Sequence, residues 1–191
     1  MNIHTETKHA VEQDTVRPSQ LIGRSPAARL ALFLTAGLFL AVPCIKAETS
    51  LAQADKDFIL AAAQGGMTEV KLGELAAQKG TRDDVKAFGR LMVKDHTAIN
   101  GDLTALAAQK GVTLPDSLDA KHQRMLDKMS AMTGAEFDSA YVSSMIKDHK
   151  MDAKEFKAES AATRDADVRT FVDKTLPVVE GHLQLITTMK K

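Results

Sequence analysis

Two copies of almost the same five-residue sequence each end in a histidine. Residues 92–96 read MVKDH and residues 145–149 read MIKDH, so a methionine precedes each histidine by four positions. Residues four apart lie on one face of an α-helix, so each copy offers an imidazole and a thioether together. This pair of ligand types suits Cu(I), although methionine more often serves as an adaptable filler of a hydrophobic core.

A glutamate and a third histidine extend this pair to a set of four ligand-type residues. Glu69, His96, His149 and His182 each fall on the otherwise apolar face of a different predicted helix. Burying one carboxylate and three imidazoles without partners costs on the order of several kcal/mol, so we expect them to face one another or to share a cation. Zinc, copper, iron and nickel are the transition metals that such ligands suit.

Secondary candidates for the same cluster are Asp152, Met92 and Met145, because each shares a helix face with one of the histidines. Asp95 and Asp148 are turned away from that face, where they either support a histidine of a neighbouring helix or lie in solvent. Counting residues from the two predicted hairpin turns gives His96 and His149 similar depths. The same count spreads the whole set over roughly 10 Å, too far for four ligands of one ion.

Gaps of three and four between apolar residues predict the helices that position these side chains. One helix is expected from residue 54 to Lys79, with Gly80 as a left-handed C-cap. Thr81 is expected to cap the second helix, with Asp84 completing a capping box, and Lys110-Gly111 to end it. A short helix over 118–132, a fourth helix ending near Ala162 and a fifth that Thr163 caps and that contains Pro177 follow.

The short connections at 80–81 and 163–164 make antiparallel neighbours of the helices that they join. Each of the two resulting hairpins has an apolar stripe that it cannot bury alone. The sequence therefore predicts an all-α fold, an antiparallel four-helix bundle with one short extra helix between the second and third long helices.

The first 47 residues have the layout of a secretory signal rather than of the bundle. Arg24 and Arg29 precede an apolar run over residues 30–42, and Ala47 offers a small residue for cleavage. We therefore expect a signal peptide over 1–47 and the bundle domain over 48–191, with an uncleaved anchor as the alternative. The predicted location is the periplasm or cell envelope, with peripheral association with the envelope. The only cysteine, Cys44, would be removed, so disulfides are not expected in the mature chain.

Charge gives little support to nucleic-acid binding. Residues 48–191 carry 20 Lys and Arg against 22 Asp and Glu, and no basic block stands out. Neither a phosphate-binding loop nor a nucleophile with an adjacent base is evident, so nucleotide and hydrolase chemistry are disfavoured.

Four sequence motifs resemble the bacterial domain-of-unknown-function family 4142. They are DxxFI…GGxxEVxLGxLAA at 55–77, FxxxMVKDHTxxNxxL at 88–103, EFDxxYVxxMIKDH at 136–149 and LPxVxxHL at 176–183. The resemblance implies an exported, ferritin-like protein of the cell envelope and no established activity. Ferritin-like di-iron proteins carry Glu-x-x-His pairs, whereas Val93, Ile146 and Val179 precede these histidines by three, so di-iron oxidase chemistry is disfavoured.

Three hypotheses follow, in order of preference. The first is an exported protein that binds a transition metal or small ligand in the bundle interior through Glu69, His96, His149 and His182. The second is a non-catalytic structural or stress-related envelope interaction module, in which these residues only fix the register of the helices. The third and least favoured is a redox enzyme.

Overall fold

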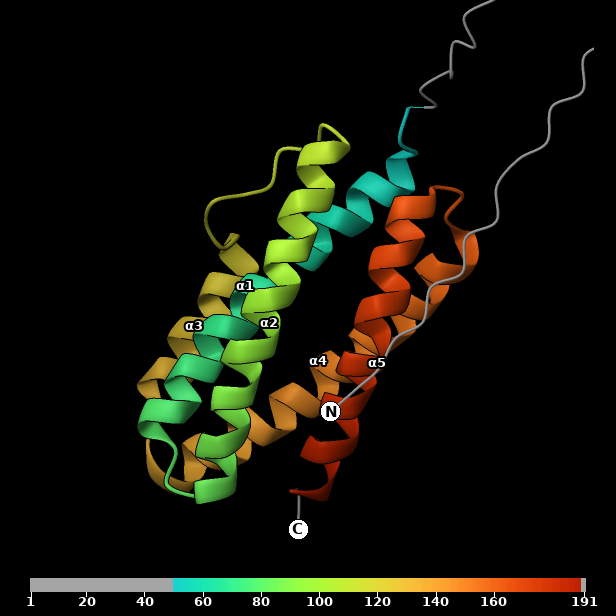
Figure 1. Cartoon of the computed structure of the whole chain (residues 1–191). Coiled ribbons are helices and arrows are strands. Elements are labelled where there is room, and N and C mark those ends of the chain that lie inside the picture. Colours follow the sequence, from blue (N-terminus) through green and yellow to red (C-terminus); the bar gives the residue numbers. More distant parts are fainter. Residues whose placement is uncertain (1–49, 190–191) are drawn as a thin grey trace, which may run out of the picture. The chain divides into compact units, whose positions relative to one another are not determined.

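A computed structural model describes residues 50–189, which contain five helices and no strand. The helices are α1 (Gln53–Lys79), α2 (Asp83–Gln109), α3 (Ala120–Ala131), α4 (Gly134–Ala162) and α5 (Ala166–Thr188) (Figure 1). The predicted all-α bundle of four long helices with a short extra one is thereby confirmed. The predicted signal peptide lies outside the described residues. Within them, none of the helices has the length and apolar character needed to cross a membrane.

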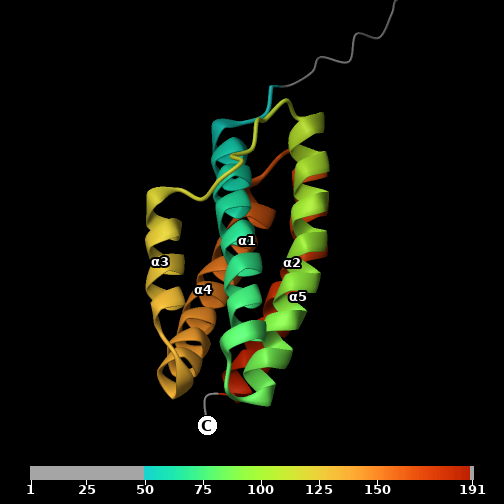
Figure 2. The ribbon, with the colours of Figure 1, turned by 90° about the vertical axis from the view of Figure 1, so that its left-hand side faces the viewer.

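The long helices form two hairpins whose turns lie at opposite ends of the bundle. The guanidinium of Arg82, beside the α1–α2 turn, donates to the carbonyl oxygen of Met189 at the end of α5 over 2.9 Å. Lys110, at the end of α2, donates to Asp165 and Asp167 at the start of α5 over 2.7 and 2.6 Å. Helices α2 and α4 therefore run in the same direction, joined by a crossover that contains α3 and lies beside α1 (Figure 2). One such crossover is typical of ferritin-like bundles.

Two glycines allow the backbones of α1 and α2 to touch. A Cβ atom on Gly73 would lie 2.8 Å from the carbonyl oxygen of Gly89, and a Cβ on Gly89 would lie 2.6 Å from that of Gly73. Any side chain at either position would push the two helices apart. This close approach lies one turn from Glu69 on α1 and two turns from His96 on α2, so it keeps these two residues within reach of each other.

The turn between α1 and α2 differs from the predicted capping. Gly80 has a φ of −52°, so it is not left-handed, and a Cβ there would instead meet the carbonyl oxygen of Ala76 at 2.7 Å. Thr81 does not cap α2; its N–H and hydroxyl donate to Asp138 of α4, as does the N–H of Arg82. Burial alone would raise the pKa of Asp138, but these hydrogen bonds outweigh it and hold the pKa below its usual value.

The N-cap of α5 also differs from the predicted one. Asp165, not Thr163, is the N-cap, and its carboxylate accepts hydrogen bonds from the N–H groups of Asp167 and Val168 at 2.9 and 3.1 Å. Thr163 lies two residues earlier and accepts a hydrogen bond from the N–H of Asp165. The helix begins later than predicted because an aspartate reaches the first free N–H groups from this later position.

The apolar interior consists of two separate clusters, one toward each end of the bundle. The first, near the α1–α2 turn, includes Phe88, Tyr141 and the fully buried Met92 and Met145. The second lies toward the α4–α5 turn and is built around residues such as Ile59, Leu103, Phe156 and Phe171. Buried polar side chains occupy the level between them: Glu69, His96, His149 and His182.

Candidate metal centre

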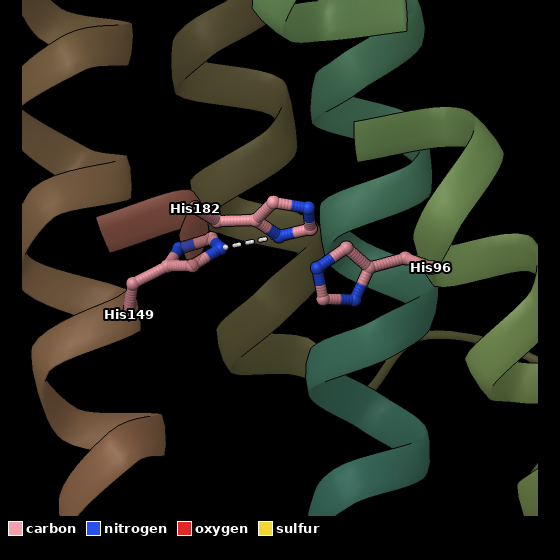
Figure 3. Close-up of side chains that lie close together, drawn as sticks. All are labelled: His96, His149 and His182. Atoms are coloured by element: carbon pink, nitrogen blue, oxygen red, sulfur yellow. Dashed lines mark hydrogen bonds between the residues drawn. The ribbon is translucent and has the colours of Figure 1, made fainter. Parts of the chain in front are cut away.

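Three histidines from three helices converge at this polar level. His96 of α2, His149 of α4 and His182 of α5 each place one ring nitrogen within 4.8 Å of the others (Figure 3). Their residues are only 3, 0 and 4% exposed to solvent. This spacing is compatible with three ligands of one ion, since zinc–imidazole bonds measure about 2.0–2.1 Å and small side-chain shifts close the remaining distance.

Each ring has one nitrogen held by a hydrogen-bond acceptor outside the cluster. His96 Nδ1 lies 2.9 Å from Oε2 of Glu69. His149 Nδ1 lies 3.0 Å from the carbonyl oxygen of Met145, one turn earlier on α4. His182 Nε2 lies 3.0 Å from Oδ2 of Asp95 on α2. A carbonyl or carboxylate oxygen only accepts, so these three nitrogens carry the hydrogens.

The other nitrogen of each ring is then a lone-pair acceptor. His149 Nε2 faces His182 Nδ1 at 3.4 Å, and His96 Nε2 is buried without a hydrogen-bond partner among residues 50–189. In neutral rings these inward nitrogens repel one another, and no donor from the described chain stands between them. Metal-binding histidines are oriented in the same way, with the outer N–H donated to a carboxylate or backbone carbonyl. The arrangement therefore favours a bound cation.

The electrostatics keep the rings of His149 and His182 neutral and Glu69 ionised at neutral pH. Burial lowers the pKa of His149 to about 4 and also lowers that of His182, where Asp95 opposes the effect only in part. Burial would raise the pKa of Glu69, but its attraction to His96 and its hydrogen bond with that ring outweigh burial and hold the pKa below the usual value. Neutral imidazole is the form that binds metals, so these two rings need no deprotonation before they bind an ion.

Asp152 adds a second carboxyl group beside Glu69. A carboxyl oxygen of each and a ring nitrogen of His149 lie within 4.8 Å of one another. Burial, together with the negative charge of Glu69, raises the pKa of Asp152 to about 9. Asp152 therefore keeps its proton at neutral pH, and only one of the two neighbouring carboxyl groups carries a charge.

The structure thus brings the four principal candidates and Asp152 together, and it corrects the depth estimate. The predicted 10 Å spread is wrong as a measure of the site, because side chains that start at different depths converge and place the three ring nitrogens within 4.8 Å of one another. Met92 and Met145 lie in the first apolar cluster, and their side chains are the fillers described for cores. Asp95 supports His182, whereas Asp148 accepts a hydrogen bond from Ser144 on its own helix at 3.1 Å. The Met145 carbonyl is a backbone group that no sequence pattern reveals.

Comparison with known proteins supplies a family and a fold. The model of the DUF4142 family, described as a domain of unknown function, matches residues 41–189. None of the curated proteins is similar enough in sequence to match the chain. A fragment of a DUF305 protein from Deinococcus radiodurans superimposes with a TM-score of 0.64 at 11% identity, over 73% of this chain and 97% of that one. CopM in its Cu(I)-bound form gives 0.60 at 17% identity, over 71 and 94%. These likenesses establish a shared fold.

Proposed function

We propose that this chain, which belongs to the DUF4142 family of unknown function, binds one transition-metal ion inside the bundle through His96, His149 and His182. The observation that carries this proposal is the set of three inward ring nitrogens with no donor between them. A cation accepts all three lone pairs at once. In this arrangement Glu69 and Asp95 hold the rings of His96 and His182 rather than binding the ion.

Copper is the metal that the ligand set favours, with zinc as the main competitor. Among divalent first-row ions, Cu(II) binds nitrogen ligands most tightly, and imidazole suits both copper and zinc. The copper-bound and silver-bound forms of CopM, which share the fold of this chain, support copper further. A purely structural role is less well supported, because a hydrogen bond between His149 and His182 requires a hydrogen on an inward nitrogen. The lowered pKa values of both rings disfavour the doubly protonated form that would provide it.

Metal titration of the purified chain tests this proposal. We expect one Cu(II) or Zn(II) ion per chain by mass spectrometry and calorimetry, and almost none after His96→Ala or His182→Ala. Asp95→Asn should weaken binding about 10- to 100-fold, because outer partners of ligating histidines contribute that much to affinity. His122→Ala is the matched control, since His122 contacts Asp119 at the start of α3 and lies outside the cluster. Unchanged affinity in the cluster variants would contradict the proposal.

We propose further that the chain is exported and works in the periplasm or cell envelope. The support is the layout of residues 24–47, with arginines before a short apolar run and a small residue at Ala47. Protein recovered from the periplasm of an expressing bacterium should begin at Glu48 by N-terminal sequencing. A membrane-bound product that retains residues 1–47 would show an anchor instead.

A further inference from the structure

A small cavity lies directly against the histidine cluster. Its volume is about 30 Å³, and Glu69 and His96 line it. Four more lining residues lie three positions from Glu69, His96, His149 and His182, respectively: Gly66, Ile99, Asp152 and Val179. Given the direction of each helix, all four are displaced toward the α4–α5 turn. The cavity therefore begins at His96 and Glu69 and extends toward the second apolar cluster.

The opposite side of the histidines is closed by apolar side chains. The ring of Phe88 lies 6.4 Å from that of His149 and 6.1 Å from that of His182, measured between centroids. Met92 and Met145, one turn from His96 and His149 on this side, are fully buried. Of the three histidines, His96 lines the cavity and the other two do not. An ion held by the three nitrogens would thus be closed on the side of Phe88 and would meet the cavity beside His96.

The cavity has the size and polarity to hold one water molecule. A water needs roughly 10–15 Å³ of such volume and two or more polar partners. Glu69, which is only 6% exposed, supplies an acceptor. Its Oε1 lies 3.6 Å from Nδ1 of His149, beyond hydrogen-bond distance, and is buried without a hydrogen-bond partner in the described part of the chain. The carboxyl group of Asp152 lines the same space. A ligand in this cavity would therefore be small and would carry a hydrogen-bond donor.

Resting on the proposed metal site, we propose that the bound ion keeps a fourth coordination position, occupied by an exchangeable water molecule that lies in this cavity and donates a hydrogen bond to Glu69. Three protein ligands plus one water is the arrangement of reactive metal sites, whereas structural sites fill all four positions with side chains. The buried ion is then open to other ligands of the size of water.

Pulsed electron paramagnetic resonance of the Cu(II)-loaded full chain in D₂O tests this inference. The wild type should show the strong deuterium coupling of a directly bound water, distinct from the weaker coupling of the imidazole N–H groups. Val179→Ile adds a methylene group to the cavity and should remove that signal while one copper ion per chain remains bound. Val172→Ile, the matched control, makes the same change elsewhere on α5, in the second apolar cluster and outside the cavity, and should retain it.

Ala62→Val fills the same cavity from α1 and serves as the second variant, should Val179→Ile not fold. A wild type that binds copper without the strong deuterium coupling overturns the fourth position but leaves the metal site intact. Persistence of the signal in a folded cavity-filling variant overturns the assignment of the water to this cavity. A wild type that binds no metal overturns the proposed function itself.

Discussion

Replacing His149 by alanine is expected to remove nearly all of the thermal stabilisation that copper or zinc gives to the wild type. An ion that binds only the folded protein stabilises it by about 2.7 kcal/mol when its free concentration is one hundred times the dissociation constant. For a domain of this size, that corresponds to a rise in melting temperature of roughly 10 °C. His149 is fully buried and faces both other rings, so no surface residue can replace its inward nitrogen.

The measurement is a thermal melt with chelator and then with each metal, for the wild type, His149→Ala and His122→Ala. The readout is the difference between the two melts of each variant, because the cavity left by the alanine lowers both melting temperatures alike. His122→Ala should keep the full difference. If the cluster only fixes helix register, the wild type should melt at the same temperature with and without metal. That result would contradict metal binding and support the structural hypothesis instead.

The metal-free protein is expected to lose about 2 kcal/mol of its free energy of unfolding between pH 7 and pH 5. Burial lowers the pKa of His149 from 6.5 to about 4. Between these two pH values, the His149 ring is protonated in the unfolded chain and neutral in the folded chain. Stability is therefore complete above the unfolded value and falls as the pH falls toward the folded one. His182 shifts in the same direction and adds to the loss. Glu69 adds its own only below about pH 4.5, where its unfolded form becomes protonated.

Urea unfolding at pH 7, 6 and 5 in the presence of a chelator measures this dependence. His149→Gln removes the titrating ring but keeps a polar side chain, and it should flatten most of the curve. A wild type whose stability stays constant from pH 7 to pH 5 would show that the rings are not held neutral in the folded state.

The sequence was sufficient for the fold because helix periodicity and short connections are local properties. Gly111, with a φ of 66°, ends α2 where the Lys110-Gly111 pair predicted it. Asp138, in contrast, accepts hydrogen bonds from a turn that lies more than fifty positions earlier in the chain. No local sequence pattern could therefore identify Asp138, rather than Thr81, as the residue that caps this turn. Here the buried carboxylate of a distant residue, rather than the side chain of a neighbouring one, accepts the hydrogen bonds of the backbone N–H groups that precede α2.

The candidate site was predicted as a list of residues but not as an arrangement. Glu69, His96, His149 and His182 stand out because they interrupt apolar stripes, which is a property of each helix alone. Their convergence depends on the crossover through α3, which sets the two hairpins in opposite directions. The repeated KDH sequence is equally uninformative about roles: Asp95 holds His182 on another helix, while its counterpart Asp148 accepts a hydrogen bond from Ser144 on its own helix.

The burial of the three rings between the two hairpins has a kinetic consequence. His96 belongs to the first hairpin and His149 and His182 to the second, so an ion bound to all three lies within the seam where the hairpins meet. It can leave only when that seam opens locally, and the rate of such opening sets its residence time. The side chain of Asp95 is 25% exposed and lines a surface groove between α2 and α5. Exchange of the ion should therefore follow the fluctuations of this helix pair more closely than the strength of the metal–nitrogen bonds.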